Sequence, residues 1–228
     1  MASRSAGSSI QDVVNESGGN GWGTDYPGSD HNFIVRLEEL TTTKPSRWAD
    51  GQPGYAVVRA TDEELFECPF IFMSDVGTVG FRESEVERLR EYLLKGGLIY
   101  VDDFWGTRAW QRWSGEIARV LPEYPIVDVG PEHMIMHALY QVPDVPQIPS
   151  IQFWRSSGRR TSERGADSAT PHLRAIFDDE GRPLVIMTYN TDIADGWERE
   201  GEDEEFFYSF SPEAYALGIN IILYAMSH

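Results

Sequence analysis

Two short, uninterrupted apolar runs constrain the fold of this chain most strongly. They are FIFM at residues 70–73 and LIYV at residues 98–101, and the segment between them, residues 82–97, has apolar side chains at helical spacing and ends in two glycines. A strand that is apolar on both sides is typical of a sheet covered by helices on both faces. Strand, helix and strand in this order predict a parallel pair, because a crossover connection returns the chain in the same direction.

The surrounding sequence continues the alternation of strands and helices. We expect a helix with Asp30 as its N-cap, a strand at 55–60, a short helix or turn at 61–69, a helix at 108–121, a strand at 125–129, a hairpin over 172–190 that turns at Asp179–Gly181, and a last helix with Ser211 as N-cap and Pro212 in first position. The fold class is therefore α/β, with a mostly parallel central sheet followed by a hairpin and a helix. Without a clear linker, residues 21–228 are expected to form one domain after a flexible segment at 1–20, with a weak strand candidate at 10–14.

The charge of the chain restricts its partners. Asp and Glu total 37 against 19 Lys and Arg, which gives a net charge of −18. Such a protein repels phosphate backbones and anionic lipid heads, so nucleic acid is not expected as a partner. No apolar run approaches the roughly 18 residues that cross a bilayer, and the N-terminus lacks the usual form of a signal peptide. With the single cysteine Cys68, no internal disulfide and no cysteine-rich zinc site can form.

Polar side chains follow the expected strands where each one ends. Asp75 follows the first apolar run, Asp102 and Asp103 follow the second, and Asn190 and Asp192 follow the hairpin's second strand. Asp195 and Glu198 lie just beyond Asp192 in the sequence, and Asp25 follows the Gly-rich segment. Because open parallel sheets bind ligands beyond the carboxyl ends of their strands, we predict a ligand-binding edge formed by Asp75, Asp102, Asp103, Trp105, Asn190 and Asp192.

Three interpretations of these acids remain open. Carboxylates from several loops could hold Ca²⁺ or Mg²⁺, although no compact calcium loop is present. Alternatively, acids beside Trp22, Trp105 and Trp197 could bind a sugar through ring stacking and hydroxyl hydrogen bonds. In the third interpretation Asp102 and Asp103 only accept backbone N–H bonds and cap the following helix. A carboxylate pair for glycoside hydrolysis is a weaker hypothesis, because it needs a set separation between the two acids.

Four other features favour structural roles. Cys68 precedes its strand, so a small buried side chain is favoured over a nucleophile. His133 and His137 could share a helical face and bind zinc, but a structural role is favoured. The Gly-rich segment 17–23 is expected to be a mobile entry loop. The basic segment 155–164 could dock on an acidic partner or a second copy, although internal pairing with the acid run 198–205 is slightly favoured.

Several longer strings resemble a bacterial family called domain of unknown function 4159. They are DVGTVGF, YLLKGGLIYVDDFWG, SIQFWR, YNTDIADGWEREGEDEEFF and YALGINIILYAM, and the resemblance runs from about Gly21 to the C-terminus. It implies the class I glutamine amidotransferase-like fold, a flavodoxin-like sandwich, and an exported or membrane-tethered location. Active enzymes of that superfamily place a cysteine after a buried strand. Here Ser74 or Asp75 would occupy the position, and a late His-x-Glu pair is also absent from the sequence, so the resemblance does not carry amidotransferase activity over.

The function expected from the sequence is a non-catalytic binding or assembly module. One alternative is a carboxylate-based, metal-assisted hydrolase that acts on a sugar-like substrate, and another is a structural subunit of a larger complex. No cofactor is expected other than a divalent cation such as calcium or magnesium. A small polar or sugar-like ligand, a protein partner and a homo-oligomer all remain open.

Overall fold

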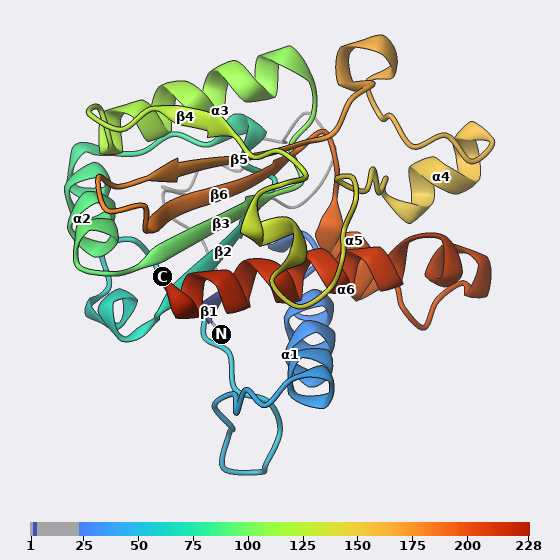
Figure 1. Ribbon diagram of the computed structural model, residues 1–228, viewed down its shortest axis with the longest axis horizontal. Coiled ribbons are helices and arrows are strands. Elements are labelled where there is room, and N and C mark those ends of the chain that lie inside the picture. Colours follow the sequence, from blue (N-terminus) through green and yellow to red (C-terminus); the bar gives the residue numbers. More distant parts are fainter. Residues whose placement is uncertain (1, 4–22) are drawn as a thin grey trace.

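The structure, a computed structural model, describes residues 2–3 and 23–228. A six-stranded sheet in the order β1-β2-β3-β6-β5-β4 forms the centre of this part of the chain (Figure 1). The strands are β1 Ala2–Ser3, β2 Phe70–Ser74, β3 Leu98–Asp102, β4 Ile126–Asp128, β5 His172–Phe177 and β6 Pro183–Tyr189. The first four in spatial order are parallel, whereas β5 and β4 run antiparallel to their neighbours. The predicted α/β class with a mostly parallel centre is confirmed.

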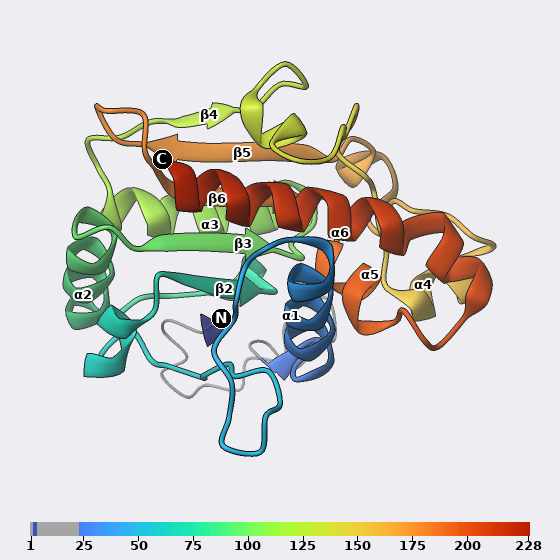
Figure 2. The same cartoon turned by 60° about the horizontal axis from the view of Figure 1, so that its bottom comes forward.

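Helices cover both faces of the sheet. They are α1 Gly28–Leu40, α2 Glu83–Leu94, α3 Gly106–Val120, α4 Ile151–Ser157, α5 Ile193–Glu198 and α6 Glu204–Ser227, with short 3₁₀ helices η2 Glu63–Glu67, η3 Val76–Thr78, η4 Met134–His137 and η5 Gly165–Ser168. Alternate residues of β2 divide between the two layers, because side chains of a strand point to opposite faces. Phe70 and Phe72 pack with α1 and α6, and Ile71 and Met73 pack with α2 and α3. Figure 2 shows α6 crossing the sheet on one face.

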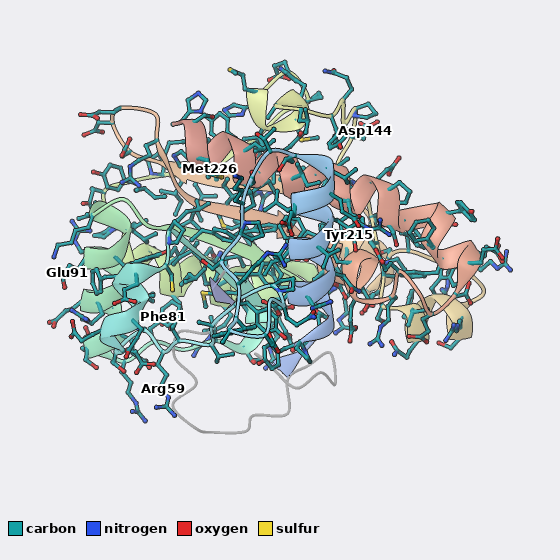
Figure 3. All side chains as sticks on the ribbon, turned by 90° about the horizontal axis from the view of Figure 1, so that it is seen from below. Arg59, Phe81, Glu91, Asp144, Tyr215 and Met226 are labelled. Carbon is teal, nitrogen blue, oxygen red and sulfur yellow. The ribbon has the colours of Figure 1, made fainter. Side chains whose placement is uncertain are left out.

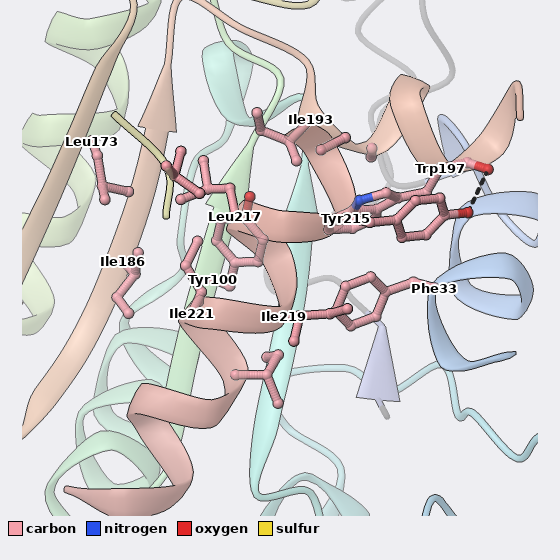
Figure 4. Packing of buried hydrophobic residues seen from close by; sticks show 14 of the residues in the cluster. Phe33, Tyr100, Leu173, Ile186, Ile193, Trp197, Tyr215, Leu217, Ile219 and Ile221 are labelled. Carbon is pink, nitrogen blue, oxygen red and sulfur yellow. Dashed lines mark hydrogen bonds between the residues drawn. The ribbon is translucent and has the colours of Figure 1, made fainter. Parts of the chain in front are cut away.

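An aromatic cluster joins α1, α5 and α6 to the sheet. The ring centroids of Phe33 and Trp197 lie 4.4 Å apart, and those of Tyr100 and Trp197 lie 6.3 Å apart. The Tyr215 hydroxyl donates to the Trp197 carbonyl at 3.5 Å, the dashed line in Figure 4. All four side chains are buried. This packing fixes α5, which follows the last central strand and carries several of the acids discussed below.

Four sequence-based expectations about the elements were wrong or incomplete. Residues 55–60 form no strand, although Val58 and Ala60 are buried. The strand predicted at 125–129 is β4, but it is an antiparallel edge strand rather than part of the parallel sheet. Asp30 lies inside α1, which begins at Gly28. The last helix begins at Glu204, capped by the Asp203 carboxylate, so Ser211 and Pro212 lie within it. Burial of Phe206 explains this earlier start, because the extra turns enter the core.

Some expectations fall outside the described residues. The strand candidate at 10–14, most of the Gly-rich segment and Trp22 lie within residues 4–22, which the structure does not describe. Ala2 and Ser3, from the segment expected to be flexible, form β1 and pair with β2. None of the described helices has the length and hydrophobicity that a membrane crossing requires.

The basic segment 155–164 makes internal ion pairs with the acid run. Arg155, which lies in α4 rather than in a loop, contacts Glu202 at 2.8 Å and Asp203 at 3.0 Å. Arg159 pairs with Glu205. These contacts agree with the expected internal pairing between the basic segment and the acid run 198–205. They join α4 and the residues after it to the beginning of α6. Because the side chains involved are largely exposed, each pair contributes little, on the order of 0–1 kcal/mol.

We predict opposite effects from adding a methyl group to two helical glycines. At Gly218 in α6, a Cβ atom would lie 2.5 Å from the Trp197 ring and 2.8 Å from the Phe33 ring, so Gly218→Ala should destabilise the fold by about 1–3 kcal/mol. At Gly115 in α3, a Cβ atom would meet nothing within 4 Å, so Gly115→Ala should stabilise by about 0.5–1 kcal/mol. Denaturant unfolding of both variants measures the difference. Equal effects would contradict the close packing of α6 on Trp197.

Candidate functional site

Three loops meet beyond the carboxyl ends of β2, β3 and β6. Backbone hydrogen bonds tie them together: the Asp75 N–H donates to the Asp102 carbonyl at 3.1 Å, and the Asn190 N–H donates to the Phe104 carbonyl at 3.0 Å. The loops adjoin because these strands are parallel neighbours, so their carboxyl ends share one edge. The structure therefore brings the predicted polar residues to the same edge of the sheet.

Four polar residues at this edge have left-handed backbones. The φ angles are 65° at Asp25, 54° at Asp75, 54° at Asp103 and 62° at Asn190. Residues other than glycine adopt this region rarely, and Asp and Asn adopt it most readily because their short side chains bond locally. Each turns the chain sharply next to a strand or helix, so the sequence needs Asp or Asn here for local structure as well as for any chemistry.

Asp102 serves as a buried cap. Its Oδ1 accepts from the Thr188 hydroxyl at 2.5 Å, and its Oδ2 accepts from the Ala194 N–H in α5 at 2.8 Å. Burial raises the pKa of Asp102 to about 7, although these hydrogen bonds act in the opposite direction. Both oxygens are occupied and the residue has no solvent exposure. Asp102 thus accepts a backbone N–H as the capping interpretation expects, but the helix is α5. The expected helix was the following one, α3, and there the Thr107 N–H donates to Asp167 Oδ2 at 2.9 Å instead.

Asp103 has different surroundings. Its Oδ1 accepts from the Trp105 indole N–H at 2.9 Å. Burial, and after it the carboxylates of Asp75 and Asp25, raise the pKa of Asp103 well above its ordinary value. Adjacent residues of one strand end therefore belong to different groups: Asp102 bonds into α5, whereas Asp103 faces other acids.

Two sets of three carboxylates lie close enough to share a cation. In one set, Asp25, Asp103 and Asp192 each offer an oxygen within 4.8 Å of the others; in the second, Asp25, Asp195 and Glu198 do the same. Ser74 donates to Asp25 Oδ2 at 3.1 Å. Asp192 also caps α5, accepting from the Asp195 N–H at 2.9 Å. Asp25 is common to both sets.

The two sets differ in their internal counter-ions. Arg199 contacts Asp195 at 3.3 Å and Glu198 at 2.6 Å, so the second set is already partly neutralised. Within the described part of the chain, no Lys or Arg pairs with a member of the first set. Burial followed by neighbouring carboxylates raises the pKa of Asp25 and of Asp192 well above the ordinary range. The first set is therefore a group of buried acids that lacks a described positive partner.

Asn190 and Trp105 have structural surroundings. Asn190 accepts from the Gly106 N–H and donates to the Thr170 carbonyl, each at 2.9 Å, which ties three loops together. Trp105 is 4% exposed and Trp197 is 1% exposed, so neither presents an open ring for a sugar. A crevice of about 10 Å³ beside Trp105 is also lined by Asp75 and Arg164, and it has room for about one water molecule.

The remaining sequence candidates lie away from this edge. Cys68 precedes β2, and burial raises the pKa of its thiol, which does not suit a nucleophile. His133 is the N-cap of η4 and its Nδ1 accepts from the Ile135 N–H, so the two histidines do not share an α-helical face as zinc ligands would. Sequence reasoning did not single out Thr188 as a partner of Asp102. Its position as a polar residue within an otherwise apolar strand was the available signal.

A comparison with known families supports the resemblance seen in the sequence. The family described as a domain of unknown function, DUF4159, matches residues 12–226. Because the match covers nearly the whole chain, the chain belongs to this family. No curated protein matches it significantly.

Stability should fall as pH rises from about 5 to about 8. A carboxyl whose pKa is raised by folding binds its proton more tightly in the folded state, so its stabilising effect is present at low pH and is lost as pH rises through the folded pKa. Asp102 and Asp195 have pKa values of about 7 in the fold. Each unit of difference from the unfolded value contributes about 1.4 kcal/mol. Denaturant unfolding at both pH values in the presence of a chelator measures this, and a flat profile would contradict it.

Proposed function

We propose that this member of the DUF4159 family is a non-catalytic binding module that takes a divalent cation at Asp25, Asp103 and Asp192. One observation carries the proposal: these three carboxylates offer oxygens within 4.8 Å of one another at the carboxyl ends of the parallel strands. Calcium lies about 2.3–2.6 Å from each oxygen ligand and magnesium about 2.0–2.1 Å. Two oxygens on opposite sides of one ion are thus about 4–5 Å apart, so oxygens that lie within 4.8 Å of one another can bind the same ion.

Electrostatics supports a cation more than any other ligand. The exposed fractions of Asp25, Asp103 and Asp192 are 7%, 6% and 3%, so water screens their mutual repulsion poorly. Buried carboxylates must be protonated, paired or metal-bound, because an isolated buried charge is very costly. A hard divalent ion would replace the protons and satisfy several oxygens at once. The set with Arg199 needs an ion less, so we assign the cation to the other set.

The arrangement of strands supports a flavodoxin-like, glutamine amidotransferase-like fold without its catalytic residues. Helices lie on both faces of parallel strands, and the position after β2 holds Ser74 and Asp75 rather than a cysteine. Within that proposal, the Ser74 hydroxyl donates to Asp25 and serves the cation site. The exported location that the family resemblance implies also remains a proposal.

The hydrolase alternative has less support from the geometry. Asp102 has a pKa near neutrality, as a general acid requires, but it is fully buried and both oxygens accept hydrogen bonds. The crevice beside Trp105 is too small for a sugar ring. These contacts favour a role for Asp102 in holding α5, and leave cation binding as the function that the edge supports best.

The proposal predicts that Ca²⁺ or Mg²⁺ stabilises the wild-type chain. A ligand that binds only the folded state at a hundred times its Kd stabilises by about 2.7 kcal/mol. Asp25→Asn and Asp103→Asn should abolish this gain, while their stability without metal holds or rises because repulsion is relieved. Thermal unfolding and calorimetric titration measure both quantities. Asp144→Asn, a change of the same kind at an exposed position, is the control and should respond as wild type does.

Asp102→Asn separates capping from ligand binding at the neighbouring position. It should lower stability by about 1 kcal/mol per lost hydrogen bond, because the bonds to Thr188 and Ala194 lose their carboxylate acceptor. Its titration with the cation should remain like that of wild type. If Asp103→Asn binds Ca²⁺ and Mg²⁺ as tightly as wild type, the cation proposal fails.

A further inference from the structure

We propose that the loop of residues 41–60 docks on the first turns of α6 in a second copy of this chain. The inference is independent of the cation site, since it concerns two other surfaces. One surface is a basic, aromatic loop, and the other is an acidic, aromatic stretch of helix. Their complementary charges and exposed rings carry the argument.

The loop is an ordered projection with an exposed tryptophan. Figures 1 and 2 show it extending away from the sheet and helices. The Trp48 N–H donates to the Gln52 carbonyl and the Gly51 N–H donates to the Trp48 carbonyl, each at 2.9 Å. Trp48 is nonetheless 51% exposed, with its ring edge-on to Tyr55 at 6.3 Å. Because these hydrogen bonds already order the turn that holds the ring in solvent, the loop loses less conformational entropy when it binds a partner.

The loop is basic although the protein is strongly acidic. It contains Lys44, Arg47 and Arg59 against Asp50 as its single acid, in a chain of net charge −18. Arg47 pairs with Glu38, while Lys44 and Arg59 are exposed and form no ion pair with the described residues. Figure 3 shows Arg59 at the periphery, pointing away from the body. These cations favour an acidic partner, and the rest of this chain is such a surface.

The beginning of α6 has the matching properties. Tyr208 is 71% exposed, and Trp48 and Tyr208 are the aromatic residues among the large exposed apolar side chains of the described chain. Glu204 lies one helical turn before Tyr208 on the same face of α6, is exposed and forms no described ion pair. An exposed ring beside an acid on α6 thus complements an exposed ring in a loop that carries Lys44 and Arg59, and aromatic anchors dominate binding at interfaces.

The two surfaces cannot meet within one copy. In Figures 1 and 2 the loop extends below the body, whereas α6 begins at its far right. The contact must therefore join different copies, and it pairs unlike surfaces. Repulsion between two acidic chains falls off beyond about 8 Å at physiological salt, so the local attraction decides the outcome at contact. One loop on one helix is a small interface, which gives weak, concentration-dependent association.

Charge reversal tests the contact directly. We expect sedimentation velocity of the wild type at physiological salt to show reversible association that increases with concentration. Lys44→Glu with Arg59→Glu, and separately Glu204→Lys, should each weaken association about tenfold or more. An equimolar mixture of these two variants should recover heterodimers, because each retains one intact surface. Lys95→Glu, which reverses an exposed charge elsewhere, should associate as wild type does.

Aromatic truncation provides a second arm. Trp48→Ala and Tyr208→Ala should each weaken association about tenfold, while circular dichroism and thermal unfolding stay near wild type because both rings are exposed. A wild type that stays monomeric at all concentrations would overturn the proposal. So would association that survives both charge reversals. Wild-type binding to phosphatidylserine vesicles, with no self-association, would assign the loop to a membrane surface instead and equally overturn it.

Discussion

The parallel pairing of β3 with β2 and β6 is the constraint on which the rest of this structure depends. β3 is buried over its whole length and is hydrogen-bonded along both edges. Its neighbours must then end at the same edge of the sheet, and so must the loops that follow them. The bonds from Asp75 to Asp102 and from Asn190 to Phe104 join these loops. Without this alignment the acids would be scattered over the molecule, and no group of carboxylates would form.

At this edge, Asp102 and Asp103 are adjacent in the chain but have different roles. Asp102 has a structural role, whereas Asp103 belongs to the candidate cation site. Asp102 is the last residue of β3, and its carboxylate accepts from Thr188 and Ala194, which ties the strand to α5. Asp103 follows with a φ of 54°, so the chain turns and its carboxylate joins Asp25 and Asp192 instead. Paired aspartates after a buried strand therefore need not act as a pair. A left-handed residue between strand and helix is enough to give them different partners.

The sequence predicted the elements whose pattern is local. The strands at 70–73 and 98–101, the helix between them and the hairpin turn at Asp179–Gly181 all formed, because strand burial, helical spacing and turn residues act over a few positions. What it could not predict depends on distant contacts. The start of α6 is decided by Phe206 entering the core, and the role of Trp197 by α1 and the sheet around it. Asp25, distant in sequence from the strand ends, joins both carboxylate sets only through the tertiary fold.

The two carboxylate sets make an internal comparison, because Asp25 belongs to both. The second set includes an acid with an internal counter-ion: Arg199, directly after the end of α5, pairs with Asp195 four residues before it. The set of Asp25, Asp103 and Asp192 has no such residue among those described, and burial raises the pKa of each of its members. An acid that is paired internally has its counter-ion within the fold, as Asp195 has Arg199. Acids that repel one another stabilise the fold only when they bind a proton or a cation. The free energy of unfolding must therefore depend on pH and on the cations in solution.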